Sequence, residues 1–219
     1  MTTTDSRVTD GVTDQELIRT HVRARIAKVQ SAYLADASWA RAAAARLRDA
    51  VKAPIGDDPQ AYRVMFEELP KRLVGGDDEP GRAELAIHLS MALFGIHQQS
   101  GRGRASHVAG ERFGAAVARL ARPDALESRE QPIMRRFTAL VTATEFSEVA
   151  QHLRGIIQLF RASDPPIALD YGQLAVDLYD LQHPATRDRV RLRWSRDAIA
   201  RPRSRAGSDA ANATTSAPA

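Results

Sequence analysis

The sequence predicts an all-α protein of about nine helices in two small bundles. The chain has 219 residues and is 43% hydrophobic, which is enough to bury the core of one ordinary domain or of two small ones. Its 38 alanines outnumber the aromatic residues, which make up 5% of the chain, and small unbranched side chains favour helix over sheet. Apolar residues recur every three or four positions, and no segment alternates with the two-residue period of a strand.

Four helices are expected in the first hundred residues. Ser38 is a suitable N-cap for the second of them, and Pro54 closes it. Pro59 suits the first turn of the third. The fourth has the clearest pattern, with apolar side chains at i, i+4, i+7, i+8 and i+11. The expected ranges are 17–33, 38–52, 59–69 and 85–96.

Five further helices are expected after the glycines near residue 100. Pro165 and Pro166 force a turn between the third and the fourth of these. Asp170 is a suitable N-cap for the fourth, and Pro184 fits the first turn of the last. The expected ranges are 107–121, 133–141, 146–160, 171–181 and 184–200.

The chain divides into two tails and two helical halves. The ends are rich in Thr, Ser, Ala, Gly and Pro, so they cannot bury an apolar face and are expected to be disordered. The glycines near residue 103 separate the halves. The expected boundaries are 1–13 for the first tail, 14–104 for the N-terminal half, 105–201 for the C-terminal basic half and 202–219 for the second tail.

Several classes of protein are excluded. The chain has no cysteine, which removes disulfide scaffolds, cysteine nucleophiles and thiolate zinc sites, and which fits a reducing cytoplasm. No apolar run is long enough for a signal peptide or a membrane helix, so no membrane partner is expected. No phosphate-binding loop or metalloprotease motif occurs, so we expect no catalytic residues and no cofactor.

One pattern leaves a metal-dependent alternative open. Glu84 precedes His88, and Glu148 precedes His152, each at an i, i+4 spacing that places both side chains on one helix face. Di-metal helical bundles instead use an i, i+3 spacing with two further glutamates. We therefore expect ordinary Glu-His pairs and no metal site, and a metal-dependent helical-bundle oxidase remains as the enzyme alternative.

The positive charge is concentrated in the second half of the chain. Residues 1–100 hold 13 basic and 14 acidic residues, whereas residues 101–219 hold 18 basic and 13 acidic ones. The only lysines are Lys28, Lys52 and Lys71, so the second half is basic through arginine alone. The planar guanidinium group suits bidentate contact with phosphates.

Arginines line up on two of the expected helices. The first line is Gln151, Arg154, Gln158 and Arg161, and the second is Arg189, Arg193 and Arg196. Side chains at these spacings share one helix face and can contact successive phosphates, which gives affinity that is independent of sequence and falls with salt. A solvated helix face is the alternative explanation for either line.

Further arginines extend this hypothesis. Arg102 and Arg104 lie in a glycine-rich loop that could close around a nucleic-acid backbone or serve as a plain connector. Arg135 and Arg136 are adjacent on one helix and point about 100° apart, so at most one is expected to share a given groove. Four phenylalanines lie on the apolar faces of the expected helices and are expected in the core: Phe113, Phe137, Phe146 and Phe160. Few aromatic rings are then left to stack on bases, which favours contact with the nucleic-acid backbone over recognition of bases.

The chain resembles the CasB family, the small subunit of the type I-E CRISPR surveillance complex Cascade. The resemblance spans about residues 38–200. The matching pieces, in order along the chain, are WARAAAARLRDAVKAP (39–54), LAIHLSMALFGIHQQ (85–99), RRFTALVTATEFSEVAQHLRGIIQLFR (135–161), LDYGQLAVDLYDL (169–181) and VRLRWSRD (190–197). The segment Tyr179 to Gln182 departs from the family, which often has a tryptophan there.

The resemblance implies a non-catalytic, all-helical subunit present in two copies in a cytoplasmic ribonucleoprotein for antiviral defence. Its implied partners are the CRISPR guide RNA, the target and displaced DNA strands, the other Cascade subunits and a second copy of itself. Matching basic positions extend the candidate nucleic-acid-binding set to Arg46, Arg48, Arg102, Arg104, Arg119, Arg135, Arg136, Arg154, Arg161, Arg193 and Arg196. A helical scaffold that binds only protein remains the non-enzymatic alternative.

Overall fold

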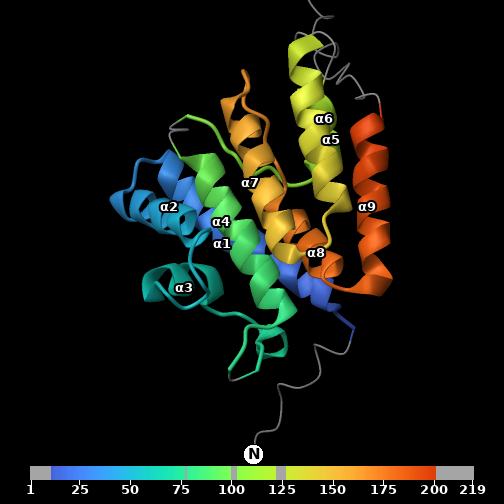
Figure 1. The fold of residues 1–219 in the computed structure, drawn as a ribbon. Helices are drawn as coiled ribbons and strands as arrows, with labels where there is room; N and C mark the ends of the chain where they lie inside the picture. The colour runs from blue at the N-terminus through green and yellow to red at the C-terminus, as the bar shows by residue number, and fades with distance from the viewer. Residues whose placement is uncertain (1–10, 77, 100–102, 122–126, 201–219) are drawn as a thin grey trace, which may run out of the picture.

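The computed structural model describes residues 11–76, 78–99, 103–121 and 127–200. Within these ranges it contains nine α-helices and one short 3-10 helix, with no strand. The all-α prediction is thus confirmed (Figure 1). The elements are α1 (Asp14–Leu34), α2 (Ser38–Ala50), α3 (Pro59–Phe66), η1 (Lys71–Leu73), α4 (Arg82–Gln98), α5 (Phe113–Leu120), α6 (Glu127–Thr142), α7 (Phe146–Ala162), α8 (Tyr171–Leu181) and α9 (Pro184–Ile199).

Helix α4 forms the centre of the molecule. Helices α1, α2, α7 and α8 all pack against it, so nearly every side chain from Ala83 to Gln98 is buried. Gly95 allows α2 to approach closely, since a Cβ there would lie 2.4 Å from the backbone nitrogen of Arg48. In Figure 1, α2 and α3 lie on one side of α4, α5, α6 and α9 lie on the other, and α1 crosses behind it.

A second group of contacts joins the helices of the C-terminal half. Helix α5 packs on α9 and α6 packs on α7. The Phe113 and Trp194 ring centroids lie 4.6 Å apart, and Gly114 faces the carbonyl of Trp194 so closely that a Cβ would lie 2.4 Å from its oxygen. Phe113, Phe137 and Phe160 are buried as predicted, while Phe146 is half-buried.

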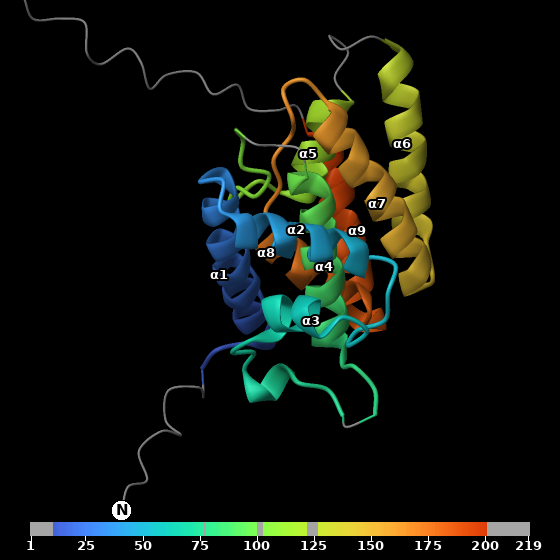
Figure 2. The ribbon, with the colours of Figure 1, turned by 90° about the vertical axis from the view of Figure 1, so that its left-hand side faces the viewer.

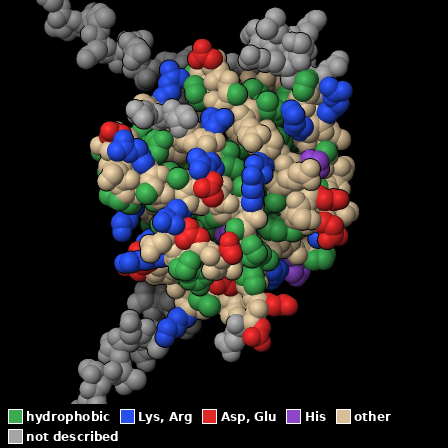
Figure 3. Space-filling model, turned by 60° about the vertical axis from the view of Figure 1, so that its left-hand side comes forward, with side chains coloured by type: hydrophobic (Ala, Val, Ile, Leu, Met, Phe, Trp, Pro, Cys, Tyr) green, Lys and Arg blue, Asp and Glu red, His purple; other side chains and the backbone are tan. Residues whose placement is uncertain are grey.

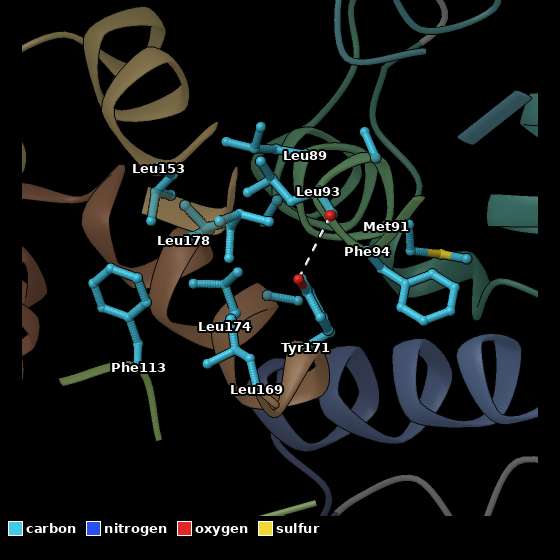
Figure 4. Close-up of a cluster of buried hydrophobic side chains, with 14 of the residues drawn as sticks. Leu89, Met91, Leu93, Phe94, Phe113, Leu153, Leu169, Tyr171, Leu174 and Leu178 are labelled. Atoms are coloured by element: carbon cyan, nitrogen blue, oxygen red, sulfur yellow. Dashed lines mark hydrogen bonds between the residues drawn. The ribbon is translucent and has the colours of Figure 1, made fainter. Parts of the chain in front are cut away.

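Helix α8 links the two predicted halves. It packs on α1 and α4 on one side and on α9 on the other. Figure 4 shows Tyr171, Leu174 and Leu178 of α8 among side chains from α4. The Tyr171 hydroxyl lies 2.7 Å from Nδ1 of His97 and 3.5 Å from the Leu93 carbonyl oxygen. Helices from both predicted halves contribute to one hydrophobic cluster. The division of the chain between residues 104 and 105 stays a prediction.

A buried carboxylate holds α1, α8 and the loop before α5 together. Asp170 caps α8, as predicted, by accepting from the Gln173 N–H at 3.1 Å. It also accepts from the Gly110 N–H at 2.8 Å and from Arg23 Nη2 at 2.5 Å. Burial alone would raise the pKa of Asp170, but these hydrogen bonds, with Arg23 first, outweigh burial and lower it.

Several boundary predictions are wrong: α3 ends at Phe66 rather than at residue 69, and α6 begins at Glu127 rather than at residue 133. Ser38 is the first residue of α2 and makes no cap, because Ala37 takes the N-cap position, and α2 ends at Ala50 rather than Lys52. The helix predicted from His107 begins only at Phe113. His107 instead forms a parallel bridge with Leu169, so this segment pairs its backbone with the α7–α8 connection.

The predicted N-terminal tail also contributes to the fold. Thr13 caps α1 by accepting from the Glu16 N–H at 3.2 Å. Arg72 donates to the carbonyl of Val12 at 3.0 Å. Residues 1–10 and 202–219 lie outside the described residues. Among the helices that the structure describes, none is long and apolar enough to cross a membrane.

Candidate nucleic-acid interface

The clearest basic surface lies on α7. One face of this helix buries Val149, Leu153, Ile156, Ile157 and Phe160 in the core. The opposite face carries the predicted line of Gln151, Arg154, Gln158 and Arg161. Within the described residues, neither arginine of this line forms an ion pair. Their guanidinium groups can therefore bind a phosphate without first breaking a salt bridge within the protein.

Arg136 of α6 adds a third guanidinium to this face. A Cβ on Gly155 of α7 would lie 3.7 Å from both Cδ and Nε of Arg136. The Arg136 side chain therefore packs against α7 at Gly155, where that helix has no side chain of its own. Arg135 and Arg136 are both exposed, and the structure places Arg136 against α7. We call Arg136, Gln151, Arg154, Gln158 and Arg161 the α7 patch.

The C-terminal end of the α7 patch lies near the end of α4. Burial, reinforced by the positive charge of Arg161, lowers the pKa of His97 to about 4. The imidazole is therefore neutral at pH 7 and adds no charge to the patch. The loop after α4 continues from this point to Arg104, which is exposed and whose carbonyl accepts from Gln98 Nε2 at 3.0 Å. Arg102 lies outside the described residues.

Four other candidates form ion pairs within the protein. Arg46 pairs with Asp58 at 2.9 Å, and Arg48 pairs with its neighbour Asp49 at 2.9 Å. These exposed pairs are weak, so a phosphate can displace the carboxylate. Figure 3 shows a face on which Lys and Arg side chains are scattered, with Asp and Glu side chains between several of them. Each of the two α2 arginines therefore has a carboxylate beside it.

Arg119 and Arg193 are bound more firmly. Arg119 pairs with Glu111 at 2.8 Å and donates to the carbonyl of Ala168 at 3.2 Å. Arg193 donates to Asp177 at 2.6 Å, and the side chain of this aspartate is 3% exposed. Both arginines therefore connect elements of the fold, in addition to any role at the surface.

The second predicted line, on α9, is interrupted. Arg189 and Arg196 are exposed, but Arg193 lies between them and is held by Asp177. On the neighbouring face, Arg187 donates to the Leu181 carbonyl at 3.0 Å and Arg191 donates to the Ala143 carbonyl at 2.5 Å. Most arginines of α9 therefore satisfy backbone and side-chain acceptors of adjacent elements.

The two Glu-His pairs have ordinary structural explanations. Glu84 Oε2 accepts from the N–H groups of Gly75 and Gly81, both at 2.8 Å, and so caps the start of α4. Glu148 caps α7 by accepting from the N–H of the N-cap residue Glu145 at 3.5 Å, and it also accepts from the Thr144 N–H at 3.2 Å. In the part of the chain that the structure describes, no three His, Asp or Glu side chains are grouped as metal ligands would be.

An exposed aromatic residue was missed by the sequence analysis. Trp39 of α2 is 49% exposed, whereas the phenylalanines that were considered for stacking are mostly buried. The signal was present in the spacing. The buried positions Ala40, Ala44 and Leu47 define the core face of α2, and Trp39 and Arg46 share a different face seven residues apart.

Comparisons with known proteins agree with this all-helical architecture. The family model described as CRISPR-associated protein Cse2 matches residues 43–197. The crystal structure of CasB from Thermobifida fusca is similar, with 30% sequence identity and a TM-score of 0.66, and the alignment covers 84% of this chain and 98% of that chain. No curated protein matched.

A second solved structure is similar in fold. M. ruber CasB has 18% sequence identity and a TM-score of 0.53, over 85% of this chain and 93% of that chain. Since the family match covers more than half of the chain and the T. fusca protein is 30% identical across nearly its whole length, the chain belongs to the CasB (Cse2) family, the small subunit of the type I-E CRISPR complex Cascade.

Proposed function

We propose that this protein is a non-catalytic subunit that binds nucleic-acid backbones through the α7 patch. In Cascade, this binding stabilises the paired guide RNA and target DNA and the displaced strand. The observation that carries the proposal is that Arg154 and Arg161 share one face of α7 and Arg136 packs beside Gly155 of the same helix, while none of the three forms an ion pair within the described residues.

The physical requirement of the task fits this arrangement. Exchange of a DNA duplex for an RNA–DNA duplex is nearly balanced in free energy, so contacts from protein to the strand backbones can shift the equilibrium toward the RNA–DNA duplex. The contacts must not depend on sequence, because each guide selects a different target. Guanidinium groups on a rigid helix meet this requirement, since they bind phosphates and leave the bases unread.

The remaining candidates are proposed as secondary contacts. Arg104 extends the α7 patch past the end of α4, and Arg135 flanks it on α6. Arg46 and Arg48 form a separate basic site on α2. Arg119, Arg193 and Arg196 contribute on the C-terminal side. The proposed partners are the guide RNA, both DNA strands, the other Cascade subunits and a second copy of this chain.

The salt dependence of binding tests the proposal. The double variant Arg154→Ala, Arg161→Ala should bind single-stranded DNA of any sequence more weakly. Each lost phosphate contact removes about 0.7 from the slope of log affinity against log salt concentration, so the slope should fall by about 1.4. Fluorescence anisotropy of a labelled oligonucleotide over a series of salt concentrations measures this slope.

A matched control removes the same charge elsewhere. Arg41 and Lys71 are exposed on α2 and η1, outside the candidate set, and Arg41 pairs with Asp36 at 2.7 Å. The variant Arg41→Ala, Lys71→Ala should keep the wild-type slope. An equal loss in both double variants would show that only net charge matters and would refute a localised α7 patch.

A further inference from the structure

A groove with a cavity volume of about 560 Å³ lies between α1, α2 and α3. Figure 2 turns toward the viewer the side of the molecule where these three helices meet. The apolar part of its lining is Val29, Trp39, Ala42, Ala43 and Val64. The charged part consists of four cations, Arg25, Lys28, Arg46 and Arg63, and one carboxylate, Glu67. The groove therefore combines a positive rim with an exposed indole.

The indole is available to a ligand. Trp39 is 49% exposed, and among the described residues no aromatic ring or guanidinium group stacks on it. The alanines beside it, Ala42 and Ala43, are too small to cover its faces. The other tryptophan of the chain is not available to a ligand, because Trp194 is 1% exposed and its indole N–H donates to Asp177 at 2.6 Å.

Two of the cations are free to face a ligand. Lys28 is exposed and forms no ion pair within the described ranges. The Arg63 side chain is 73% exposed and contacts Glu67 through Nε alone at 3.2 Å, so its two terminal nitrogens remain available. Arg25, by contrast, pairs with Glu67 at 3.0 Å and donates to the Val64 carbonyl at 2.9 Å, so it supports the wall of the groove.

We infer that this groove stacks one unpaired base of a single-stranded nucleic acid on Trp39, with the adjacent phosphates held by Lys28 and Arg63. The inference rests on the proposed function, since it adds a base contact to a backbone-binding protein. A flat ring beside cations is the arrangement that binds single strands without reading their sequence. An acidic peptide is the competing ligand, but the exposed indole offers a base a flat ring to stack on, which a carboxylate side chain would not use.

The site was not predictable from the family match. That match begins at residue 43, so Trp39 and the α1 wall of the groove precede it. The α7 patch lies on different helices, which allows the two sites to be tested separately.

Tryptophan fluorescence tests the inference directly. The chain has two tryptophans, and only Trp39 is exposed enough to meet a ligand. A 12-residue oligothymidylate should quench the emission of the wild-type protein, and the variant Trp39→Phe, which keeps the buried Trp194, should show no quenching. Trp39→Ala should weaken binding of the oligomer by roughly tenfold. Arg41→Ala provides a matched control on the same helix.

Two further probes separate stacking from charge. An abasic strand of the same length has the phosphates but no bases, so it should raise the anisotropy signal of binding without quenching Trp39. If the thymidylate strand binds without quenching Trp39, or if the abasic strand quenches equally, the stacking site is refuted while the proposed function stands. If neither strand binds, both fail. If a glutamate-rich peptide binds and quenches better than thymidylate, the groove is a protein-docking site and the inference is overturned.

Discussion

Helices α7 and α9 carry arginines at the same spacings, yet they place them in different chemical environments. Arg154 and Arg161 on α7 form no ion pair among the described residues. Arg136 of α6 lies beside Gly155 of α7 and adds a third guanidinium group. On α9, Arg193 is bound to the buried Asp177, and Arg187 donates to a backbone carbonyl. A line of arginines in a sequence therefore does not show whether its guanidinium groups face solvent or complete the fold.

The cause of the difference lies in the neighbouring elements. Helix α9 follows α8 after a short turn and packs on its C-terminal end, where the Leu181 carbonyl needs a donor. The buried Asp177 of α8 also requires a positive partner. Helix α7 packs on α4 and α6 through an apolar face, and among the described residues no carboxylate pairs with Arg154 or Arg161 on its polar face.

The largest predicted effect is on stability, and it separates the two helices. Arg193→Ala should destabilise the protein by about 3 kcal/mol, because it leaves the carboxylate of Asp177 buried with only Trp194 and Gln173 as partners. Arg154→Ala, a change on the exposed face of α7, should alter stability by about 0.5 kcal/mol or less. Urea denaturation of both variants measures the difference, and equal losses would refute the structural role of Arg193.

Asp177 provides a check on that prediction. Burial raises its pKa, and Arg193 together with the Trp194 and Gln173 hydrogen bonds opposes this rise. The double variant Asp177→Asn, Arg193→Ala removes both charges. It should therefore recover part of the stability that Arg193→Ala loses. If it is less stable than Arg193→Ala, the loss does not arise from an unpaired buried carboxylate.

The second effect is a loss of stability in acid, and its largest single source is His97 of α4, which lies near Arg161 of α7. Because the pKa of His97 is about 4 in the folded protein against 6.5 for the free side chain, the unfolded chain binds a proton that the folded one excludes. Stability is therefore full above pH 6.5 and falls as the pH drops toward 4. His97 alone should remove about 2 kcal/mol between pH 7.5 and pH 5. Burial also lowers the pKa values of His21, His88 and His107, so these act in the same direction.

His97→Asn tests this contribution, since an amide can keep the contact with Tyr171 and does not titrate. The variant should lose less stability in acid than the wild type. Arg161→Ala should raise the pKa of His97, because the positive charge of Arg161 helps to lower it, whereas Arg189→Ala on α9 should leave it unchanged. An NMR titration of the imidazole would contradict the assignment if the two variants shifted it equally.

The sequence was sufficient to predict most of the helices and the family. It was insufficient to predict which arginines form ion pairs or hydrogen bonds within the protein. Helical periodicity placed α7 and α8 within two residues of their observed bounds, and Asp170 is the predicted cap. The start of α5 was missed because His107 pairs with Leu169, which is 62 residues away and leaves no local signal. The pairing of Arg193 with Asp177 was missed for a similar reason, since it depends on the angle at which α9 packs on α8.

The smallest effect concerns Gly155, the position that lets Arg136 join the α7 patch. Gly155→Ala should stabilise the protein by about 0.5–1 kcal/mol, because alanine favours the helix and its Cβ would lie at ordinary contact distance, 3.7 Å, from Arg136. The salt slope of DNA binding should not change. Gly155→Glu should instead make α7 resemble α9, because the new carboxylate beside Arg136 would form an ion pair with it. Arg136 could then no longer bind a phosphate, and the loss of this one contact should lower the salt slope by about 0.7. If Gly155→Glu binds DNA with the wild-type slope, Arg136 is not part of the interface, and the patch reduces to the arginines of α7 itself.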